Sequence, residues 1–232
     1  MDELTVISLG GSIIVPDEID VAFLTKFNTA LRSYLQEKKS RRIILVCGGG
    51  APARTYQTAM RTINPEIDIE LLDWLGIRAT HLNGQLIKSI FSDLSPDELV
   101  INPTGHISFK GQVLVATGWK PGFSTDTDAV LLAERFGGKR IINLSNIEKV
   151  YTDDPKLNPD AQPLDSISWA EFRKMVGDTW IPGKNTPFDP VASKRAARLR
   201  MQVICADGRN IENMMDILYG RPYVGTLIGA QE

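Results

Sequence analysis

The sequence predicts an α/β fold, a three-layer α/β/α sandwich around a mainly parallel sheet. Short runs of aliphatic residues alternate with segments whose apolar residues recur every three or four positions. Two of these runs, Arg42–Cys47 and Arg140–Leu144, are apolar almost throughout, as in strands covered on both faces. Several runs end in glycine- or aspartate-rich segments, at the sheet edge where such folds bind ligands.

The first half of the chain contains two strands and two long helices in this interpretation. Leu4–Leu9 is a strand that stops at glycine, and a helix with one apolar face follows Pro16. Arg42–Cys47 is the second strand. A long helix is expected over 69–90, with an inward face formed by Leu72, Leu75, Ala79, Leu82, Leu86 and Ile90.

The second half continues the alternation. Residues 107–115 predict a hairpin that turns at Lys110-Gly111. A helix over 125–136 is closed by two glycines. The remaining strands are expected at 140–144 and 201–205, with a last edge strand at 225–228, and the remaining helices at 168–176, 190–199 and 210–218. Residues 151–167 and 177–190 are expected to be irregular loops over the site.

Composition excludes several classes of protein. The 232 residues carry a net charge of −2, without the basic excess of a general nucleic-acid binder. No apolar run approaches membrane-spanning length, so a cytoplasmic protein is expected. Cys47 and Cys205 each close an apolar run and are interpreted as buried hydrophobic residues. His81 and His106 have no evident partner in the sequence and are interpreted as structural or surface residues.

Two glycine-rich turns follow predicted strands. Gly10-Gly11-Ser12 offers backbone without side chains and one hydroxyl donor, which suits a phosphate but also an ordinary tight turn. Gly48-Gly49-Gly50 follows a buried strand, where three glycines weaken structure unless bare backbone is needed. Arg54 comes one helical turn later and could face the same phosphate, although most arginines are simply solvated.

The segment Gly118–Ala129 is the most informative part of the chain. It combines two glycines, two hydroxyls and two carboxylates before a helix, a pattern that exposes backbone N–H groups to an anion. The acids can cap the helix or hold a metal ion. Asp73, in an apolar stretch, faces either solvent or a partner such as a sugar hydroxyl. Residues 145–155 end in a proline-terminated turn, where Tyr151 offers a flat face for a base.

The ordered motifs resemble the amino acid kinase superfamily, and within it the archaeal-type uridylate (UMP) kinases. They are Gly-Gly-Ser, Gly-Gly-Gly-x-x-x-Arg, Asp-x-x-Gly-Ile, Pro-Gly-x-x-Thr-Asp and Asn-x-x-x-Val-Tyr-Thr-x-Asp-Pro. The resemblance runs from about residue 4 to 229. It implies a single domain with an acceptor-binding lobe at about 1–135 and an ATP-binding lobe at about 136–232. It also implies transfer of the ATP γ-phosphoryl group to UMP.

The resemblance assigns roles to the motif residues. The implied ATP-binding residues are Gly10, Gly11, Ser12, Gly50, Arg54, Ser145, Asn146, Tyr151 and Asp154. The implied UMP-binding residues are Gly48, Gly49, Asp73, Trp119, Lys120, Pro121, Gly122, Phe123, Ser124 and Thr125. The implied catalytic residues are Arg54, Asp126, Lys120 and Lys184. Mg²⁺ would enter with ATP, without direct protein ligands. The partners would be nucleotides only, in a homo-oligomer, often a hexamer.

Two departures leave alternatives open. Many relatives have a lysine two residues before the first glycine, where this chain has Ser8. Lys120 or Lys184 could supply the charge, or both could be solvated loop lysines. The sequence Trp119-Lys120-Pro121 differs from the one that is usual in the UMP-binding loop of such kinases. The acceptor could therefore be an acylamino acid, a carbamate or a small phosphate, or the chain could be a non-catalytic nucleotide-binding or storage module.

Overall fold

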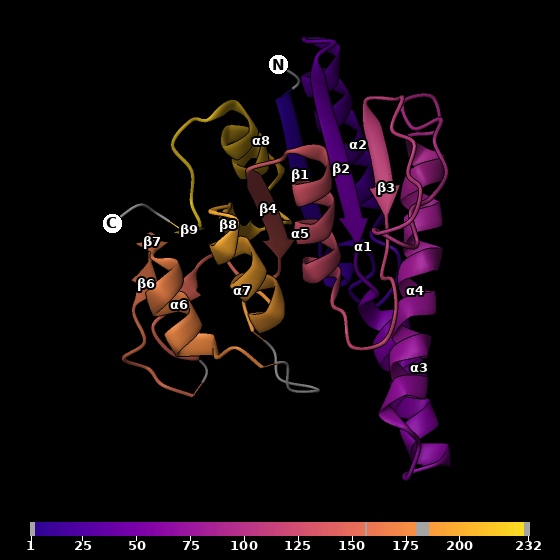
Figure 1. Cartoon of the computed structure of the whole chain (residues 1–232), viewed down its shortest axis with the longest axis vertical. Coiled ribbons are helices and arrows are strands. Elements are labelled where there is room, and N and C mark those ends of the chain that lie inside the picture. Colours follow the sequence, from indigo (N-terminus) through magenta and orange to yellow (C-terminus); the bar gives the residue numbers. More distant parts are fainter. Residues whose placement is uncertain (1–2, 156, 180–185, 230–232) are drawn as a thin grey trace.

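The computed structural model describes residues 3–155, 157–179 and 186–229. Within them, a seven-stranded sheet has the order β3-β2-β1-β4-β8-β9-β7, and only β8 and β9 pair antiparallel (Figure 1). Its strands are β1 (Glu3–Leu9), β2 (Arg41–Cys47), β3 (Val113–Ala116), β4 (Arg140–Ser145), β7 (Ser166–Ile167), β8 (Gln202–Asp207) and β9 (Thr226–Ile228). A separate hairpin joins β5 (Val150–Tyr151) to β6 (Pro163–Leu164).

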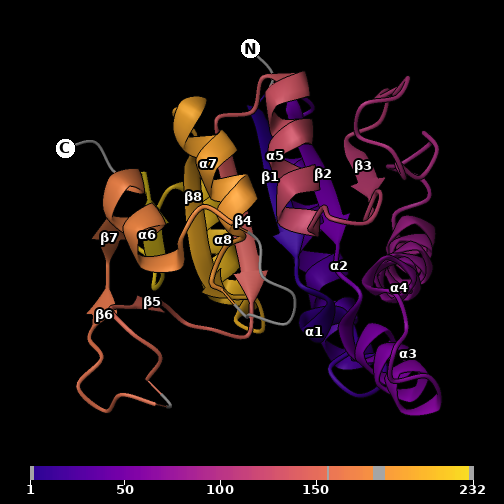
Figure 2. The same ribbon diagram turned by 60° about the horizontal axis from the view of Figure 1, so that its bottom comes forward.

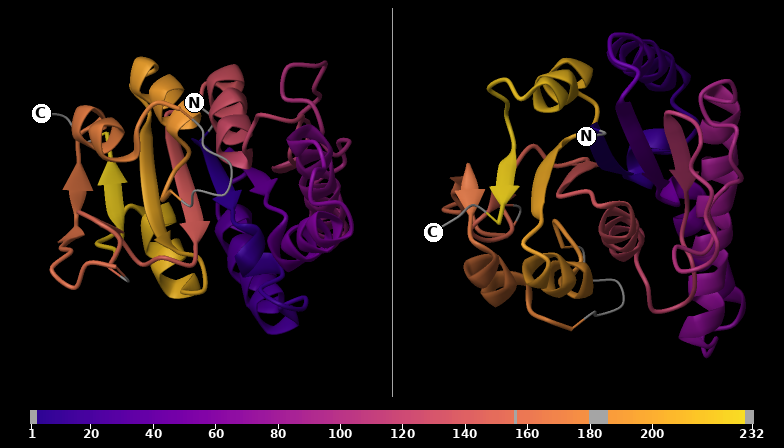
Figure 3. Two further views of the ribbon diagram at one scale, coloured as in Figure 1. Left: turned by 90° about the horizontal axis from the view of Figure 1, so that it is seen from below. Right: turned by 45° about the horizontal axis from the view of Figure 1, so that its top comes forward.

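Helices cover both faces of the sheet (Figure 3). They are α1 (Gly11–Ile14), α2 (Val21–Gln36), α3 (Gly50–Ile63), α4 (Ile69–Ile90), α5 (Thr125–Phe136), α6 (Trp169–Val176), α7 (Pro190–Arg198) and α8 (Ile211–Tyr219). Apolar residues of α2, α8 and the end of α4 form one core cluster with the sheet. Those of α5, α6 and α7 form the other cluster. The three-layer α/β sandwich predicted from the sequence is confirmed.

The central strands divide their side chains between these two clusters. In β2, Ile43 and Leu45 belong to the cluster under α2, whereas Ile44 and Val46 belong to the cluster under α5. All four side chains are fully buried. Burial on both faces explains why this run is apolar throughout rather than alternating. The carboxyl ends of β1, β2 and β4 therefore emerge side by side from a rigid core.

Local capping sets the limits of α5, the helix that follows the informative loop. The Ser124 hydroxyl accepts the N–H of Thr127 at 3.2 Å at its start. Gly137 ends the helix in a left-handed conformation, with φ of 75°. A serine N-cap and a left-handed glycine at the C-terminus are the expected caps, because they satisfy N–H and C=O groups that the helix leaves unpaired. The predicted limits of this helix are confirmed.

The hairpin predicted at 107–115 is wrong. Only Val113–Ala116 forms a strand, and it pairs parallel to β2. The N–H groups of Lys110 and Gly111 instead bind the carboxylate of Asp97, at 2.6 and 3.1 Å. A side chain at Gly111 would also meet the Leu94 carbonyl at 2.2 Å. This glycine therefore marks a close backbone approach rather than a hairpin turn.

Two further expectations are corrected. The strand at the end of the chain, β9, is not an edge strand, because it lies between β8 and the short edge strand β7. Leu82 does not face inward but is 66% exposed. The buried face of α4 instead includes Thr80, Asn83 and Gly84, because a close contact between Gly84 and Thr117 sets the rotation of the helix.

Candidate functional site

The two predicted glycine turns lie at the same edge of the sheet, at the ends of the adjacent strands β1 and β2. The Gly48 N–H donates to the Leu9 carbonyl at 2.9 Å, and the Gly10 N–H donates to the Leu144 carbonyl at 2.8 Å. A Cβ atom at Gly11 would lie 2.0 Å from the Gly50 nitrogen. The turns thus touch through bare backbone, which no residue other than glycine permits here.

Helix α3 starts inside the second turn, and no side chain caps its positive end, although the Ala51 N–H donates to the Val15 carbonyl at 2.9 Å. Gly50 has φ of +63°, and the N-cap residue Gly49 provides no side chain to cap the helix. The first turn of the helix also lacks acidic residues. The partial positive charge of a helix N-terminus is favourable for a phosphate. Arg54, in the second turn, donates from Nη2 to the Pro16 carbonyl at 2.8 Å and remains exposed beside this end.

Helix α4 contacts the second glycine turn and the loop that follows β3. The Asn83 amide donates to the carbonyls of Gly48 and Gly49, at 2.8 and 3.1 Å. The Thr80 hydroxyl accepts the Gly118 N–H at 2.9 Å. One helix thus holds two segments that are far apart in sequence. Figure 2 shows α4 beside β3 and the start of α3.

Residues 118–123, here called the acceptor loop after the role that the resemblance implies, are also held by the side chains of His81 and Asp73. His81 Nε2 lies 3.0 Å from the Gly118 carbonyl and donates to it in the tautomer that carries the proton there. Burial, and secondarily Arg78, lower the pKa of His81, which favours the neutral ring. The carboxylate of Asp73 accepts the Gly122 N–H at 3.1 Å. Asp73 therefore has a partner in the loop.

The tip of the acceptor loop carries two aromatic rings and a cation. The ring centroids of Trp119 and Phe123 are 4.9 Å apart. Lys120 Nζ lies 4.1 Å from the Trp119 centroid and 5.0 Å from that of Phe123. Cation–π attraction holds the ammonium group at this position. The loop thus combines flat apolar surface with a positive charge, which suits a nucleotide.

Asp126 occupies the position next to the serine that stands in place of the expected lysine. The Ser8 hydroxyl donates to Asp126 Oδ1 at 3.0 Å, and the Asp189 N–H donates to Asp126 Oδ2 at 3.1 Å. Loss of hydration, and secondarily the Asp189 carboxylate, raise the pKa of Asp126 to about 6. Lys184 lies outside the described residues.

Asp128 is the second carboxylate at the start of α5. It is fully buried. Its Oδ2 accepts the Trp119 N–H at 3.2 Å, whereas Oδ1 has no hydrogen-bond partner among the described residues. Burial, and secondarily the nearby Asp126, raise the pKa of Asp128 to about 7. The carboxyl therefore takes up a proton far more easily than an exposed aspartate does.

The residues assigned to the adenosine half of ATP fall into two groups. Ser145 ends β4 beside the first glycine turn, because a Cβ atom at Gly10 would lie 3.5 Å from its Cα. The Gly208 N–H donates to the Ser145 carbonyl at 2.8 Å. Tyr151 is half-buried in the β5–β6 hairpin, and Asp154 is exposed in the turn that follows. Figure 2 shows this hairpin beyond β8, away from β1.

A family model described as the amino acid kinase family matches residues 3–207. The chain belongs to the amino acid kinase family. The uridylate kinase of Thermoplasma volcanium is 34% identical over 230 residues, 98% of each chain. That of Thermofilum pendens is 32% identical over 231 residues, again 98% of each chain.

Solved structures agree with this family assignment. The uridylate kinase of Archaeoglobus fulgidus superposes with a TM-score of 0.80 at 30% identity, covering 97% of this chain and 99% of that chain. The UMP kinase of Bacillus anthracis has a TM-score of 0.75 at 18% identity, which supports the fold alone. Together these comparisons confirm the resemblance and the fold class expected from the ordered motifs.

The structure adds site residues that the motifs did not identify. Four side chains contact the backbone of the second glycine turn or of the acceptor loop: Thr80, His81, Asn83 and Asp128. His81 was interpreted as a structural or surface residue, and it is structural in the sense that it holds Gly118. For Thr80, His81 and Asn83 the available signal was the group of polar residues inside the otherwise apolar pattern of 69–90. Asp128 lies in the segment Gly118–Ala129, whose acids were interpreted as helix caps or metal ligands.

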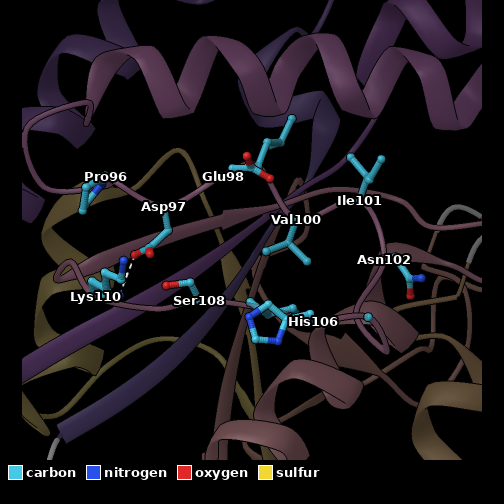
Figure 4. Close-up of a pocket in the computed structure, with 12 residues that line it drawn as sticks. Pro96, Asp97, Glu98, Val100, Ile101, Asn102, His106, Ser108 and Lys110 are labelled. Atoms are coloured by element: carbon cyan, nitrogen blue, oxygen red, sulfur yellow. Dashed lines mark hydrogen bonds between the residues drawn. The ribbon is translucent and has the colours of Figure 1, made fainter.

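A separate hollow of about 450 Å³ lies between residues 96–102 and 105–110 (Figure 4). Asp97 in its wall binds the N–H groups of Lys110 and Gly111, so its carboxylate is already used in holding the loop. The hollow does not include the glycine turns or the acceptor loop.

No helix in the described residues is long and apolar enough to cross a bilayer.

The contact between the glycine turns predicts the effect of Gly11→Ala. The new methyl group would lie 2.0 Å from the Gly50 nitrogen and 2.6 Å from the Gly48 carbonyl carbon, so the turns must separate. We expect kinase activity to fall by at least a hundredfold. Gly105→Ala is the matched control, because its Cβ would meet nothing closer than 3.5 Å. Steady-state rates of both variants test this, and near-normal activity of Gly11→Ala would contradict it.

The raised pKa of Asp128, about 7, predicts a pH-dependent stability. An unfolded aspartate has a pKa near 3.9, so the contribution of this group is complete below that value and is lost as pH rises through about 7. Between pH 5.5 and 8 the wild type should lose on the order of 2 kcal/mol of unfolding free energy relative to Asp128→Asn. Urea denaturation at both pH values measures this difference. Parallel pH profiles would show that Asp128 does not titrate in this range.

Proposed function

We propose that this chain is an ATP-dependent UMP kinase, which converts ATP and UMP to ADP and UDP. The observation that carries the proposal is the direct backbone contact between the Gly10–Gly11 and Gly48–Gly50 turns. Two bare-backbone turns in contact can hold two phosphates tail to tail, the arrangement that in-line transfer requires. Relatives named uridylate kinase, 30–34% identical over nearly the whole chain, support the choice of acceptor.

In the proposed reaction, a phosphate oxygen of UMP forms a bond to the γ-phosphorus of ATP, and the bond to the β,γ-bridging oxygen breaks. ADP leaves with that oxygen. The UMP phosphate is already an anion, so no general base is needed. Catalysis consists of alignment and of neutralising the charge that develops on the transferring group. This requirement fits a site built from turns, helix ends and cations rather than from a histidine centre.

The two nucleotides divide the site residues between them. ATP phosphates lie on Gly10, Gly11 and Ser12, and the adenosine lies toward Ser145 and Tyr151. The remaining proposed ATP residues are Asn146, Asp154, Gly50 and Arg54. UMP lies between Gly48, Gly49, Asp73 and the acceptor loop with Ser124 and Thr125. Lys120 lies on the loop rings at the acceptor side, and Asp126 orders the start of α5 and α7 through its bonds to Ser8 and Asp189.

Magnesium enters this scheme with ATP. Among the described residues, no three His, Cys, Asp or Glu side chains gather where they could hold a metal ion. Both oxygens of Asp126 already accept hydrogen bonds, from Ser8 and Asp189. We propose that the ion would be held by the triphosphate and not by direct protein ligands. When bound there, Mg²⁺ neutralises charge on the transferring phosphoryl group.

The proposed reaction also implies a pathway, a cellular location and an assembly for the enzyme. UDP formation belongs to pyrimidine nucleotide synthesis, and we propose a cytoplasmic enzyme whose partners are nucleotides. We also propose a homo-oligomer, a hexamer as in the family resemblance. Leu71 and Leu82 of α4 are 54% and 66% exposed, and an assembly that covers this helix would bury them. The acceptor lobe at 1–135 and the ATP lobe at 136–232 remain a proposed division.

A coupled assay of ADP release tests the proposed acceptor. We expect turnover with UMP, weaker turnover with CMP and dUMP, and none with acylamino acids, carbamate or small phosphates. Inert UMP would overturn the proposal, and activity with another acceptor would replace it. Binding of ATP and UMP without UDP formation would indicate a non-catalytic nucleotide-binding module. Direct detection of UDP separates these outcomes.

The position of Asp73 predicts a selective loss of affinity for UMP. Asp73→Asn keeps an oxygen for the Gly122 N–H but removes the charge that strengthens a bond to a ribose hydroxyl. We expect KM for UMP to rise about tenfold and KM for ATP to change less than twofold. Asp68→Asn is the matched control, because Asp68 only caps the same helix and asparagine caps equally well. Equal changes in both KM values would contradict the ribose role.

A further inference from the structure

Asp128 is a fully buried carboxyl group whose hydrogen bonds within the described residues are incomplete. It is fully buried in the first turn of α5, and one of its oxygens has no partner among the described residues. Burial of a carboxylate costs several kcal/mol unless hydrogen bonds compensate. Within the described residues, its carboxyl group accepts one hydrogen bond, from the Trp119 N–H at 3.2 Å. A residue that served only the core would have both oxygens satisfied or would be apolar.

The hydrogen bond from Trp119 to Asp128 joins the start of the acceptor loop to the helix that follows the loop. The acceptor loop leaves β3, passes α4 and enters α5 through the Ser124 cap (Figure 1). Asp128 lies nine residues after Trp119 and binds the loop from the helix that the loop itself enters. The start of the loop is therefore attached on two sides, to α5 by Asp128 and to α4 by Thr80 at Gly118.

The attached backbone controls the groups at the loop tip. Trp119 carries one of the two rings, and Nζ of the next residue, Lys120, lies 4.1 Å from the centroid of that ring. A shift of the Trp119 backbone would move both the ring and the ammonium group. Thr80 and His81 hold only Gly118, and Asp73 holds only Gly122. The Asp128 side chain, by contrast, binds the backbone of Trp119 itself.

We propose that Asp128 is a positioning residue, which holds the backbone of Trp119 so that the ring and Lys120 meet the acceptor nucleotide. This inference rests on the proposed function for the identity of the acceptor. Because Asp128 is fully buried, it acts through the loop backbone and not by direct contact with a nucleotide. Its effect passes through the Trp119 N–H to the acceptor loop, and the ATP side of the site is untouched. Its loss should therefore weaken acceptor binding selectively.

Three variants test the proposal. Asp128→Ala removes the acceptor of the Trp119 N–H, and we expect KM for UMP to rise about tenfold with KM for ATP within twofold. Asp128→Asn keeps an oxygen in the same place and should restore KM for UMP to within threefold of wild type. Asp97→Ala is the matched control, since Asp97 is also buried and holds a loop backbone, but at the amino end of β3. It should lower Tm without changing either KM.

Hydrogen exchange of a peptide covering residues 118–124 gives a second readout that needs no activity. Exchange should speed up in Asp128→Ala by at least tenfold and remain near wild type in Asp128→Asn and Asp97→Ala. If Asp128→Ala does not fold, Asp128→Ser, which is too short to reach Trp119, takes its place. An inert wild type with the expected exchange pattern would refute the UMP assignment while leaving the positioning role intact.

The opposite pattern overturns the positioning role. If wild type turns over UMP but Asp128→Ala leaves KM for UMP and loop exchange unchanged, Asp128 does not position the loop. Equal rises in both KM values together with a lower Tm would indicate a purely structural carboxylate. Failure of Asp128→Asn to rescue KM and exchange would show that the hydrogen bond to Trp119 is not the cause.

Discussion

The site depends on the contact between two glycine turns at the ends of adjacent parallel strands. Gly11 and Gly48 approach so closely that a Cβ atom on either would lie within 2.4 Å of backbone. Parallel pairing of β1 with β2, in register from Glu3↔Arg41 to Leu9↔Cys47, brings the turns to this distance. Burial of both strands on both faces makes the register rigid. The rest of the site is arranged around this pair of turns.

Helix α4 and helix α5 supply the polar groups that hold the acceptor side. Their contacts are with backbone rather than with other side chains: Asn83 with the second glycine turn, Thr80 with Gly118 and Asp128 with Trp119. Backbone contacts of this kind fix a loop without specifying the side chains it presents. The loop can thus carry rings and a lysine for the ligand while its path is set by the two helices.

Sequence patterns predicted the elements with continuous or periodic burial and missed what depends on contacts distant along the chain. The strand Arg42–Cys47 and the helix over 125–136 follow from local composition and caps. The rotation of α4 does not, because it is set by the contact of Gly84 with Thr117, more than thirty residues away. The failed hairpin has the same origin, since Asp97 takes the backbone N–H groups of Lys110 and Gly111.

The electrostatics of the site follow from the absence of lysine at position 8. Ser8 gives Asp126 a hydroxyl instead of an ammonium group, and Asp128 lies nearby with one unpaired oxygen. Loss of hydration is the main reason why the pKa values of both groups are raised; the Asp189 carboxylate adds to the rise at Asp126, and Asp126 adds to the rise at Asp128. The ionised form of either carboxyl group would repel an approaching phosphate, and the raised pKa values reduce that negative charge near neutral pH. In the proposed division of the site, the start of α3 and Arg54 supply positive charge on the ATP side and Lys120 supplies it on the acceptor side, so the position of Lys120 on its loop matters for charge compensation there.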